Sequence, residues 1–283
     1  MMLKKAISWL NVCANSGCRA KPVRTRLLCS GAYIGNDRYC SPDCLHTGLA
    51  EHFGELLQKP KAVQSKRRHR IPLGLELVSR GYIDGPALQA ALQRQKQQPE
   101  SRLGQILMSM GAVSEDQITT AVAAQWSVPV LRPDPCHVPE ATQLIPFALM
   151  ERYKMLPVHF NKQQNRLHMA FAQAVDYSVL YSIEQMLGVK TEACMADESV
   201  LVNLIGLTSN QDRPAEYVLN NISARELVSM IAGYALRLRT ERINASSCHG
   251  QIWVRATTKA SVATHFMFNS LSQREAMPEA SQY

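Results

Sequence analysis

The chain has 283 residues, with 31 Lys and Arg against 23 Asp and Glu, so its formal net charge is +8. Hydrophobic residues make up 46% of it and charged residues 19%, which excludes a largely disordered chain. No run approaches about 18 apolar residues, which excludes a transmembrane helix. A polar, cysteine-bearing segment follows the short apolar run at the start, so we expect no signal peptide and a cytoplasmic location. The sequence pI of about 9.1 favours an anionic partner.

Five of the eight cysteines lie within the first 44 residues, and such clustering in a cytoplasmic chain is typical of a metal site. Two close pairs, spaced C-x4-C and C-x3-C, flank a stretch of 21 residues. A tetrahedral zinc ion takes four ligands, usually from two such pairs. We therefore predict a zinc site made by Cys13, Cys18, Cys40 and Cys44. The alternative is that these cysteines are small buried apolar residues, with one redox-active pair among them.

The segment between the pairs is predicted to form two short strands joined by a turn of Gly, Asn and Asp, which brings the pairs together. Cys29 lies in an apolar stretch and is expected in the core, while His46 or His52 remains an alternative ligand for one cysteine. Tyr39–Cys44 resembles the second knuckle of treble-clef and ribbon-type zinc fingers, in which a short helix follows the last cysteine. About 50 residues bury too little surface to be stable alone, which favours a metal within residues 1–58.

A basic linker is predicted over residues 59–70, where six of twelve positions are Lys or Arg. No aromatic or β-branched cluster interrupts it. Two interpretations stay open: a solvated tether, or an electrostatic attraction for a phosphate-bearing ligand.

Two copies of one pattern follow, Pro72–Gln95 and Arg102–Gln125, offset by 30 residues. Four aligned pairs are similar apolar residues, and six are identical: Leu73/Leu103, Gly74/Gly104, Leu77/Leu107, Gly81/Gly111, Ala91/Ala121 and Gln95/Gln125. This degree of agreement indicates an internal repeat.

Each copy is predicted to form two helices around a tight turn. Gly81 and Gly111 suit the left-handed position that follows the end of a helix. Asp84 and Ser114 suit the N-cap of the second helix, and Ser114-x-x-Gln117 has the form of a capping box.

The repeat resembles the N-terminal, c-di-GMP-binding domain (MshEN or GspE-N type) of type II secretion and type IV pilus assembly ATPases, which are bacterial proteins. That domain contains two RLGxxLxxxGxxxxxxLxxALxxQ motifs joined by a short spacer. The second copy matches from Arg102 to Gln125, and the spacer is Lys96–Ser101. The first copy matches from Leu73 to Gln95 but has Pro72 where the motif has arginine.

The resemblance implies a cyclic dinucleotide ligand with two equivalent halves. An arginine can donate two hydrogen bonds to guanine O6 and N7, a glycine lets the backbone approach closely, and N–H groups at a helix start can bind a phosphate. The candidate residues are Arg102, Leu103, Gly104 and Gln125 in a complete half-site, Leu73, Gly74 and Gln95 in a half-site without arginine, and Arg70 as a substitute donor two residues before Pro72. The alternative is a repeat that serves only as a folding unit.

Residues 127–210 are predicted to form a small α/β sandwich, with helices over 141–152, 177–187 and 197–206 and strands over 155–160, 166–172 and 189–195. It resembles the second half of the same ATPase region at Leu144-Ile145-Pro146, Tyr153, Leu156-Pro157, Leu167, Ala170 and Asp176. The family's Asp-Pro pair, whose aspartate helps to hold the ligand, is Gln173-Ala174 here.

Residues 211–283 are predicted to form a helix over Ala224–Arg239 and a β-hairpin of Gln251–Arg255 and Ala263–Phe268. The segment weakly resembles the start of the next ATPase domain. The fold class predicted for the whole chain is therefore α+β multidomain: a zinc-ribbon-like head, a tandem helical repeat (71–126) packed with an α/β sandwich (127–210), and a C-terminal piece.

No G-x-x-x-x-G-K-[ST] phosphate loop and no hydrolase or metalloprotease motif occurs in the sequence, so we expect no enzymatic activity. The first hypothesis is a regulatory or adaptor protein that binds c-di-GMP or a related nucleotide and docks on a secretion or pilus ATPase. Two alternatives remain: a zinc-finger protein that binds nucleic acid, and a structural adaptor that has lost nucleotide binding.

Overall fold

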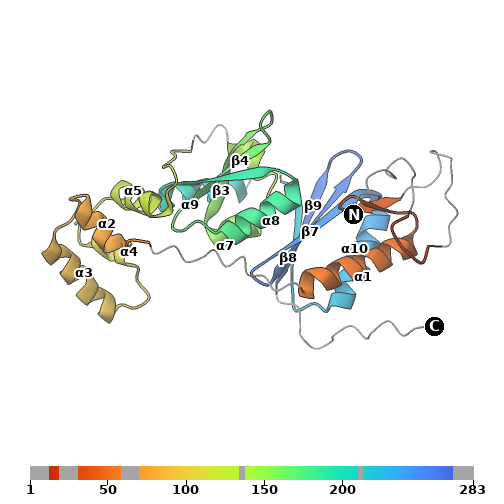
Figure 1. Ribbon diagram of the computed structural model, residues 1–283, viewed down its shortest axis with the longest axis horizontal. Coiled ribbons are helices and arrows are strands. Elements are labelled where there is room, and N and C mark those ends of the chain that lie inside the picture. Colours follow the sequence, from red (N-terminus) through yellow and green to blue (C-terminus); the bar gives the residue numbers. More distant parts are fainter. Residues whose placement is uncertain (1–12, 19–30, 59–69, 134–137, 210–212, 270–283) are drawn as a thin grey trace, which may run out of the picture. The chain divides into compact units, whose positions relative to one another are not determined.

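The computed structural model describes residues 13–18, 31–58, 70–133, 138–209 and 213–269 (Figure 1). Cys29 and all but the last residue of the predicted basic linker lie outside the described residues. The described residues form ten helices and nine strands in two mixed sheets. None of these helices is long and apolar enough to cross a membrane. The chain divides into two compact units, one of residues 1–61 with 214–283 and one of residues 62–213.

The first unit is built on a six-stranded sheet whose order is β2-β1-β7-β8-β9-β6. The β1–β7 and β6–β9 pairs are parallel and the other neighbours are antiparallel. The strands are β1 (Ala32–Ile34), β2 (Asp37–Tyr39), β6 (Ala215–Asn220), β7 (Thr240–Cys248), β8 (Gln251–Thr258) and β9 (Ala263–Asn269). Two helices, α1 (Pro42–Gln58) and α10 (Ala224–Arg237), pack on each other (Figure 1).

One core joins the two helices to one face of this sheet. It contains Leu49 and Phe53 from α1 and Leu227 and Ile231 from α10, all 0 or 1% exposed, and alternate residues of the strands: Ile243, Ile252, Val254, Ala256, Phe266 and Phe268. The sequence predicts that the head and the C-terminal segment are separate pieces. In the structure they share this core and sheet, because neither piece has enough apolar surface to enclose a core alone.

The join between the two ends of the chain is made by β1 and β7. Ile34 pairs with Ile243, and the guanidinium of Arg242 donates hydrogen bonds to the Gly35 carbonyl at 2.5 Å and to the Asn36 side chain at 3.1 Å. The two-residue loop between β1 and β2 has Gly35 at φ +58°, a left-handed conformation that glycine adopts without strain. This is the turn predicted between the cysteine pairs.

The second unit begins with four helices from the repeat: α2 (Leu73–Ser79), α3 (Gly85–Gln97), α4 (Leu103–Ser109) and α5 (Glu115–Trp126). Its other part has the three-stranded sheet β3-β4-β5, in which β3 (Met155–Asn161) is antiparallel and β5 (Lys190–Met195) parallel to β4 (Arg166–Phe171). Four helices accompany this sheet: α6 (Val138–Thr142), α7 (Phe147–Tyr153), α8 (Tyr177–Leu187) and α9 (Glu198–Ser209).

The predicted elements of residues 127–210 are confirmed with one difference. The helix expected over 141–152 is split into α6 and α7, and Pro146 occupies the N-cap of α7 with φ −56° and ψ 140°. Proline has no N–H to donate to the preceding turn, so it begins a helix more readily than it continues one. In the C-terminal segment, β6 and β7 were not predicted.

Candidate functional site

The repeat folds twice in the same way because the same local signals occur in both copies. Gly81 and Gly111 both have φ +69°, directly after the C-caps of α2 and α4. Asp84 accepts a hydrogen bond from the N–H of Ala87 at 2.8 Å, and Ser114 forms the predicted capping box with Gln117. These predictions of turn and cap residues are confirmed.

The glutamine at the end of each copy holds the chain just before the other copy's first helix. The Gln95 side-chain amide donates to the Ser101 carbonyl at 3.2 Å, and the Gln125 amide donates to the Ile71 carbonyl. Ser101 and Ile71 are themselves 30 residues apart, so the two bonds are equivalent under the repeat. Both candidate ligand-binding glutamines therefore have a structural partner.

The motif leucine of each copy also lies near the motif glycine of the other copy. A Cβ placed on Gly74 would lie 3.4 Å from a methyl of Leu103, and one placed on Gly104 would lie 3.8 Å from a methyl of Leu73. The first turns of α2 and α4 therefore meet around a local two-fold relationship. Both glycines are buried and both leucines are partly exposed.

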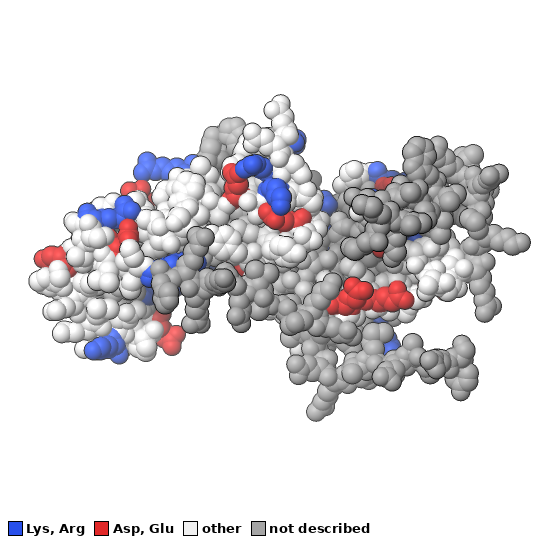
Figure 2. All heavy atoms as spheres, viewed as in Figure 1, with Lys and Arg blue, Asp and Glu red and all other residues white. Residues whose placement is uncertain are grey.

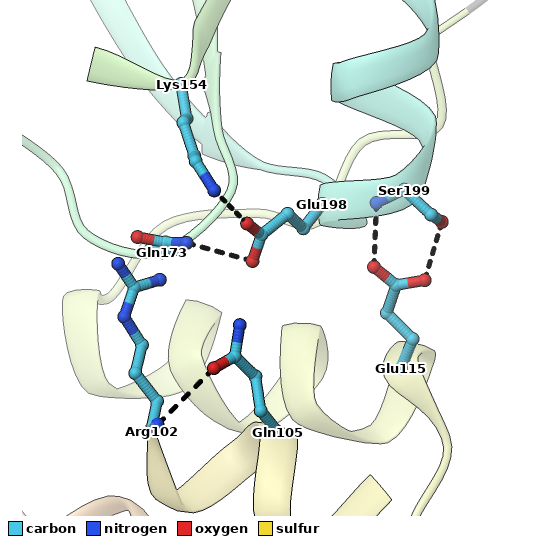
Figure 3. Close-up of polar contacts among 7 residues, drawn as sticks. All are labelled: Arg102, Gln105, Glu115, Lys154, Gln173, Glu198 and Ser199. Carbon is cyan, nitrogen blue, oxygen red and sulfur yellow. Dashed lines mark hydrogen bonds and ion pairs between the residues drawn. The ribbon is translucent and has the colours of Figure 1, made fainter. Parts of the chain in front are cut away.

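Arg102 is exposed at the N-cap of α4 and extends beside Gln173 and Glu198 (Figure 3). Its backbone N–H donates to the Gln105 side chain at 3.3 Å, which fixes the start of the helix. Among the described residues, its guanidinium has no hydrogen-bond or ion-pair partner. Arg102 is thus a candidate residue that is both charged and available.

Glu198, at the start of α9, is the acidic group of this region. Its carboxylate accepts hydrogen bonds from the Lys154 ammonium and, at 2.9 Å, from the Gln173 amide (Figure 3). Burial acts to raise the pKa of the Glu198 carboxyl, but these bonds and the charges of Lys154 and Arg102 outweigh it and hold the pKa below its ordinary value. The carboxylate therefore stays ionised beside the arginine.

Two further hydrogen-bonded contacts join α5 of the repeat to the start of α9. The Glu115 carboxylate accepts from the Ser199 N–H at 2.8 Å and from its hydroxyl at 2.6 Å (Figure 3), and the Thr119 hydroxyl donates to Asp197. These contacts fix Glu198 relative to the repeat. The contacts of Lys154, Glu198 and Glu115 were not predicted from the sequence, because they join residues 44 to 84 positions apart and no motif marks them.

The first copy has different side chains at the start of its first helix, α2. Pro72, at the position equivalent to Arg102, is the exposed N-cap residue of α2 and has no charged group. Arg70 lies two residues earlier, with its guanidinium carbon 3.1 Å from the centre of the Trp126 ring. The structure thus places a cation near the start of each copy, but on different backbone positions.

The four predicted zinc ligands come together in the first unit. The Sγ atoms of Cys13, Cys18, Cys40 and Cys44 all lie within 4.8 Å of one another, with Cys18–Cys40 at 3.5 Å and Cys40–Cys44 at 4.0 Å. Sulfurs bound tetrahedrally at about 2.3 Å from a metal lie about 3.8 Å apart, so the cluster fits a single metal ion. His46 and His52 are not members of the cluster found in the described residues.

The thiols differ in acidity when no metal is bound. Burial raises the pKa of Cys40 to about 12, whereas a hydrogen bond with Ser41 is the largest cause that lowers the pKa of Cys44 to about 7. A metal would therefore displace protons from the cluster on binding. Cys194 is separate: it is buried in the second unit, donates to the Met169 carbonyl, and burial raises its pKa to about 12.

The positive charge of the chain is unevenly placed along the sequence. Of the 31 Lys and Arg, 12 lie outside the described residues, and so do 4 of the 23 Asp and Glu. The described residues therefore contain 19 basic and 19 acidic side chains and have no formal net charge. On the face shown in Figure 2, basic and acidic side chains of the described residues lie close to one another. The excess of +8 therefore belongs to the segments that the structure does not describe, including residues 59–69.

Comparisons with known proteins find the following similarities. The chain is 24% identical over 131 residues to the type IV pilus assembly ATPase PilB of Thermus thermophilus, and the match covers 46% of this chain and 15% of that protein. A solved structure of MshE with cdg is 29% identical, covers 49% of this chain and 99% of that one, and has a TM-score of 0.42. The N-terminal domain of XpsE is 19% identical, with coverage of 47% and 91% and a TM-score of 0.34.

A protein-family description, the MshEN domain, matches residues 126–215. The matched span begins at the last residue of α5 and contains the three-stranded sheet with helices α6 to α9. It includes Gln173 and Glu198, which lie near Arg102, and Lys154, which is paired with Glu198 (Figure 3). Residues 126–215 of the chain therefore form an MshEN domain.

Proposed function

We propose that the chain is a non-catalytic regulatory or adaptor protein that binds a cyclic dinucleotide of the c-di-GMP type on its tandem repeat and docks on a secretion or pilus partner. One observation carries the proposal. Gln95 and Gln125 make equivalent hydrogen bonds across the two copies, so that the starts of α2 and α4 meet around a local two-fold relationship. A ligand with two equivalent halves matches that arrangement.

The chemistry of one half-site supports a guanine. Arg102 is exposed, its guanidinium has no partner among the described residues, and its in-plane N–H groups suit the O6 and N7 acceptors of guanine. Leu103 offers a partly exposed apolar side chain next to it. Lys154 adds positive charge, although Glu198 partly neutralises it. We expect Arg102 to make the largest polar contribution to binding.

The polar groups described near Arg102 support a ligand-binding role. Among the described residues, these groups are the Gln173 amide and the Glu198 carboxylate, which accepts hydrogen bonds from that amide and from Lys154. Such a site suits recognition and release of a ligand. In the structural-adaptor alternative the fold is the same, but Pro72 and Gln173 stand in place of two binding groups. Titration with the ligand distinguishes this alternative from the proposed function.

For the cysteine cluster we propose zinc as the ion. Four thiolates satisfy tetrahedral zinc completely and leave no open coordination position for a substrate. Cys44 lies in the first turn of α1, whose Leu49 and Phe53 belong to the core of the first unit. The role of the metal is thus to fix this helix against the short β1–β2 hairpin.

Isothermal titration calorimetry of the full chain with c-di-GMP tests the proposed function. We expect saturable binding at micromolar ligand and a loss of about tenfold or more in affinity for Arg102→Ala, the value of a bidentate contact to guanine. Arg94→Ala, which removes an exposed arginine at the far end of α3, is the matched control and should bind normally. Absence of heat for the wild type would leave the structural adaptor as the better description.

A further inference from the structure

The two copies of the repeat differ in where their arginine is. The second copy has Arg102 at the N-cap of α4, whereas the equivalent Pro72 of the first copy has no donor. We propose that Trp126 is a positioning residue that holds Arg70 as the guanine-contacting arginine of the first half-site. This inference rests on the proposed function, since it assigns a group to the second half of the same ligand.

The backbone that carries Arg70 is fixed on its C-terminal side. The Gln125 side chain holds the carbonyl of Ile71, the residue next to Arg70. Pro72 follows with φ −53°, an angle that its ring restricts. Trp126 is the neighbour of Gln125, so the end of α5 holds both the main chain at Ile71 and the side chain of Arg70.

The stack on Trp126 orients Arg70 without using its donors. The guanidinium carbon lies over the ring, 3.1 Å from its centre, and a cation–π contact of this kind uses none of the N–H donors of the guanidinium. Among the described residues, Arg70 has neither a hydrogen bond nor an ion pair. Trp126 is supported in turn by Tyr177, with ring centres 6.1 Å apart. The arginine is thus pre-organised, which lowers the entropy lost on binding.

The other copy has no equivalent stack. Thirty residues separate Trp126 from Lys96 and Arg70 from Glu100, and both of these counterparts are exposed polar residues. The arginine–tryptophan pair thus lies beside the start of the copy that lacks the motif arginine, whereas Lys96 and Glu100 occupy the equivalent positions beside the start of the copy that has Arg102. This complementary distribution is the expected result if each half of the ligand needs one arginine.

Calorimetric titration of the full chain with c-di-GMP tests the inference through four variants. Arg70→Ala and Trp126→Leu should each weaken binding about tenfold, the loss of one bidentate contact, and Trp126→Phe should bind within about threefold of the wild type because it retains a ring for the guanidinium. The double variant R70A/W126L should bind no more weakly than R70A alone, since Trp126 acts through Arg70. Wild-type binding by R70A would overturn the inference, as would a further loss in the double variant.

A purely structural role for Trp126 predicts a different pattern. Trp126→Leu would then weaken binding by the same factor with or without Arg70, and Trp126→Phe would not restore it.

The outcomes also separate this inference from the proposed function. If the wild type binds c-di-GMP and only Arg102→Ala weakens it, the assignment of Arg70 and Trp126 fails alone. If the wild type does not bind, both fail.

Discussion

The side-chain amide of Gln125 donates a hydrogen bond to the main-chain carbonyl of Ile71, 54 residues earlier in the chain. Its counterpart under the repeat, Gln95, does the same for Ser101 over only 6 residues. The same bond thus closes a short loop in one place and a long one in the other. The motif glutamines act first as structural residues that set the position of the two helix starts.

We predict that Gln125→Ala and Gln95→Ala each lower the free energy of unfolding of the second unit by about 1 kcal/mol, the net value of an intramolecular hydrogen bond. The measurement is chemical denaturation followed by circular dichroism. Gln93→Ala, at an exposed position on α3, is the control and should change stability by less than about 0.5 kcal/mol. Equal stability of Gln125→Ala and this control would contradict the structural role.

The two motif glycines should respond differently to alanine. A Cβ on Gly74 would lie 2.6 Å from a methyl of Leu88, whereas one on Gly104 would lie 3.4 Å from a methyl of Ile118. Because Leu88 is partly buried against the core of the repeat, we expect its displacement in Gly74→Ala to cost about 1 kcal/mol. Gly104→Ala should be neutral or stabilising, since alanine is favoured over glycine in a helix by about 0.5–1 kcal/mol.

Thermal denaturation of the two single variants checks this order. Each variant is the control for the other, because both replace glycine with alanine at equivalent positions of the two copies. A lower melting temperature for Gly104→Ala than for Gly74→Ala would show that the close approach of helices is not where the structure places it.

The parts of the fold that the sequence predicts well are those with local causes. Gly81, Asp84 and Ser114 act on their own turns and caps, and each has the conformation expected of it. Pro146 is also a local signal, because it marks the interruption between α6 and α7. The single helix predicted over 141–152 runs through this proline and does not take it into account. Short-range stereochemistry is readable from one sequence because the interacting atoms are a few residues apart.

The missed features depend on long-range contacts. Strand β7 pairs with β1 about 200 residues earlier, and its sequence, TERINASSC, has too little apolar alternation to predict a strand. Glu198 and Lys154 likewise have no motif, and only the fold brings them to Arg102. The candidate cysteines were found because their spacing is itself the signal.

Glu198 should make the stability of the second unit depend on pH. Its pKa is lower in the folded chain than the ordinary value of 4.5, so the ionised carboxylate stabilises the fold. That contribution is complete above pH 4.5 and is lost as the pH falls through the lower folded pKa. Glu198→Gln should therefore be less stable than the wild type at neutral pH, by about 1 kcal/mol for a partly exposed ion pair.

Urea denaturation of both proteins between neutral and acidic pH measures this effect. The two stabilities should converge in acid, because the wild-type carboxyl is then protonated as well. Glu151→Gln, an exposed carboxylate on α7, serves as the control for loss of one negative charge. A constant difference between wild type and Glu198→Gln at every pH would contradict the assignment of the shifted group.

Removal of the metal should affect the first unit alone. With zinc bound, the four thiolates join the segment of Cys13 and Cys18 to the start of α1, and a structural zinc site contributes about 10–16 kcal/mol of apparent binding energy to folding. We expect one zinc per chain in the wild type and none in Cys40→Ser/Cys44→Ser. Cys194→Ala, which removes a buried thiol of the second unit, should keep its zinc.

Hydrogen exchange with mass spectrometry locates the effect. A chelator should speed amide exchange in α1 and in the neighbouring β1 and β2, because the cluster includes Cys44 in the first turn of α1 and Cys40 directly after β2. Exchange in α2 to α5 should be unchanged, since the repeat has its own core. Equal zinc in wild type and the double cysteine variant, or protection of α1 that survives complete metal removal, would show that burial alone stabilises the first unit.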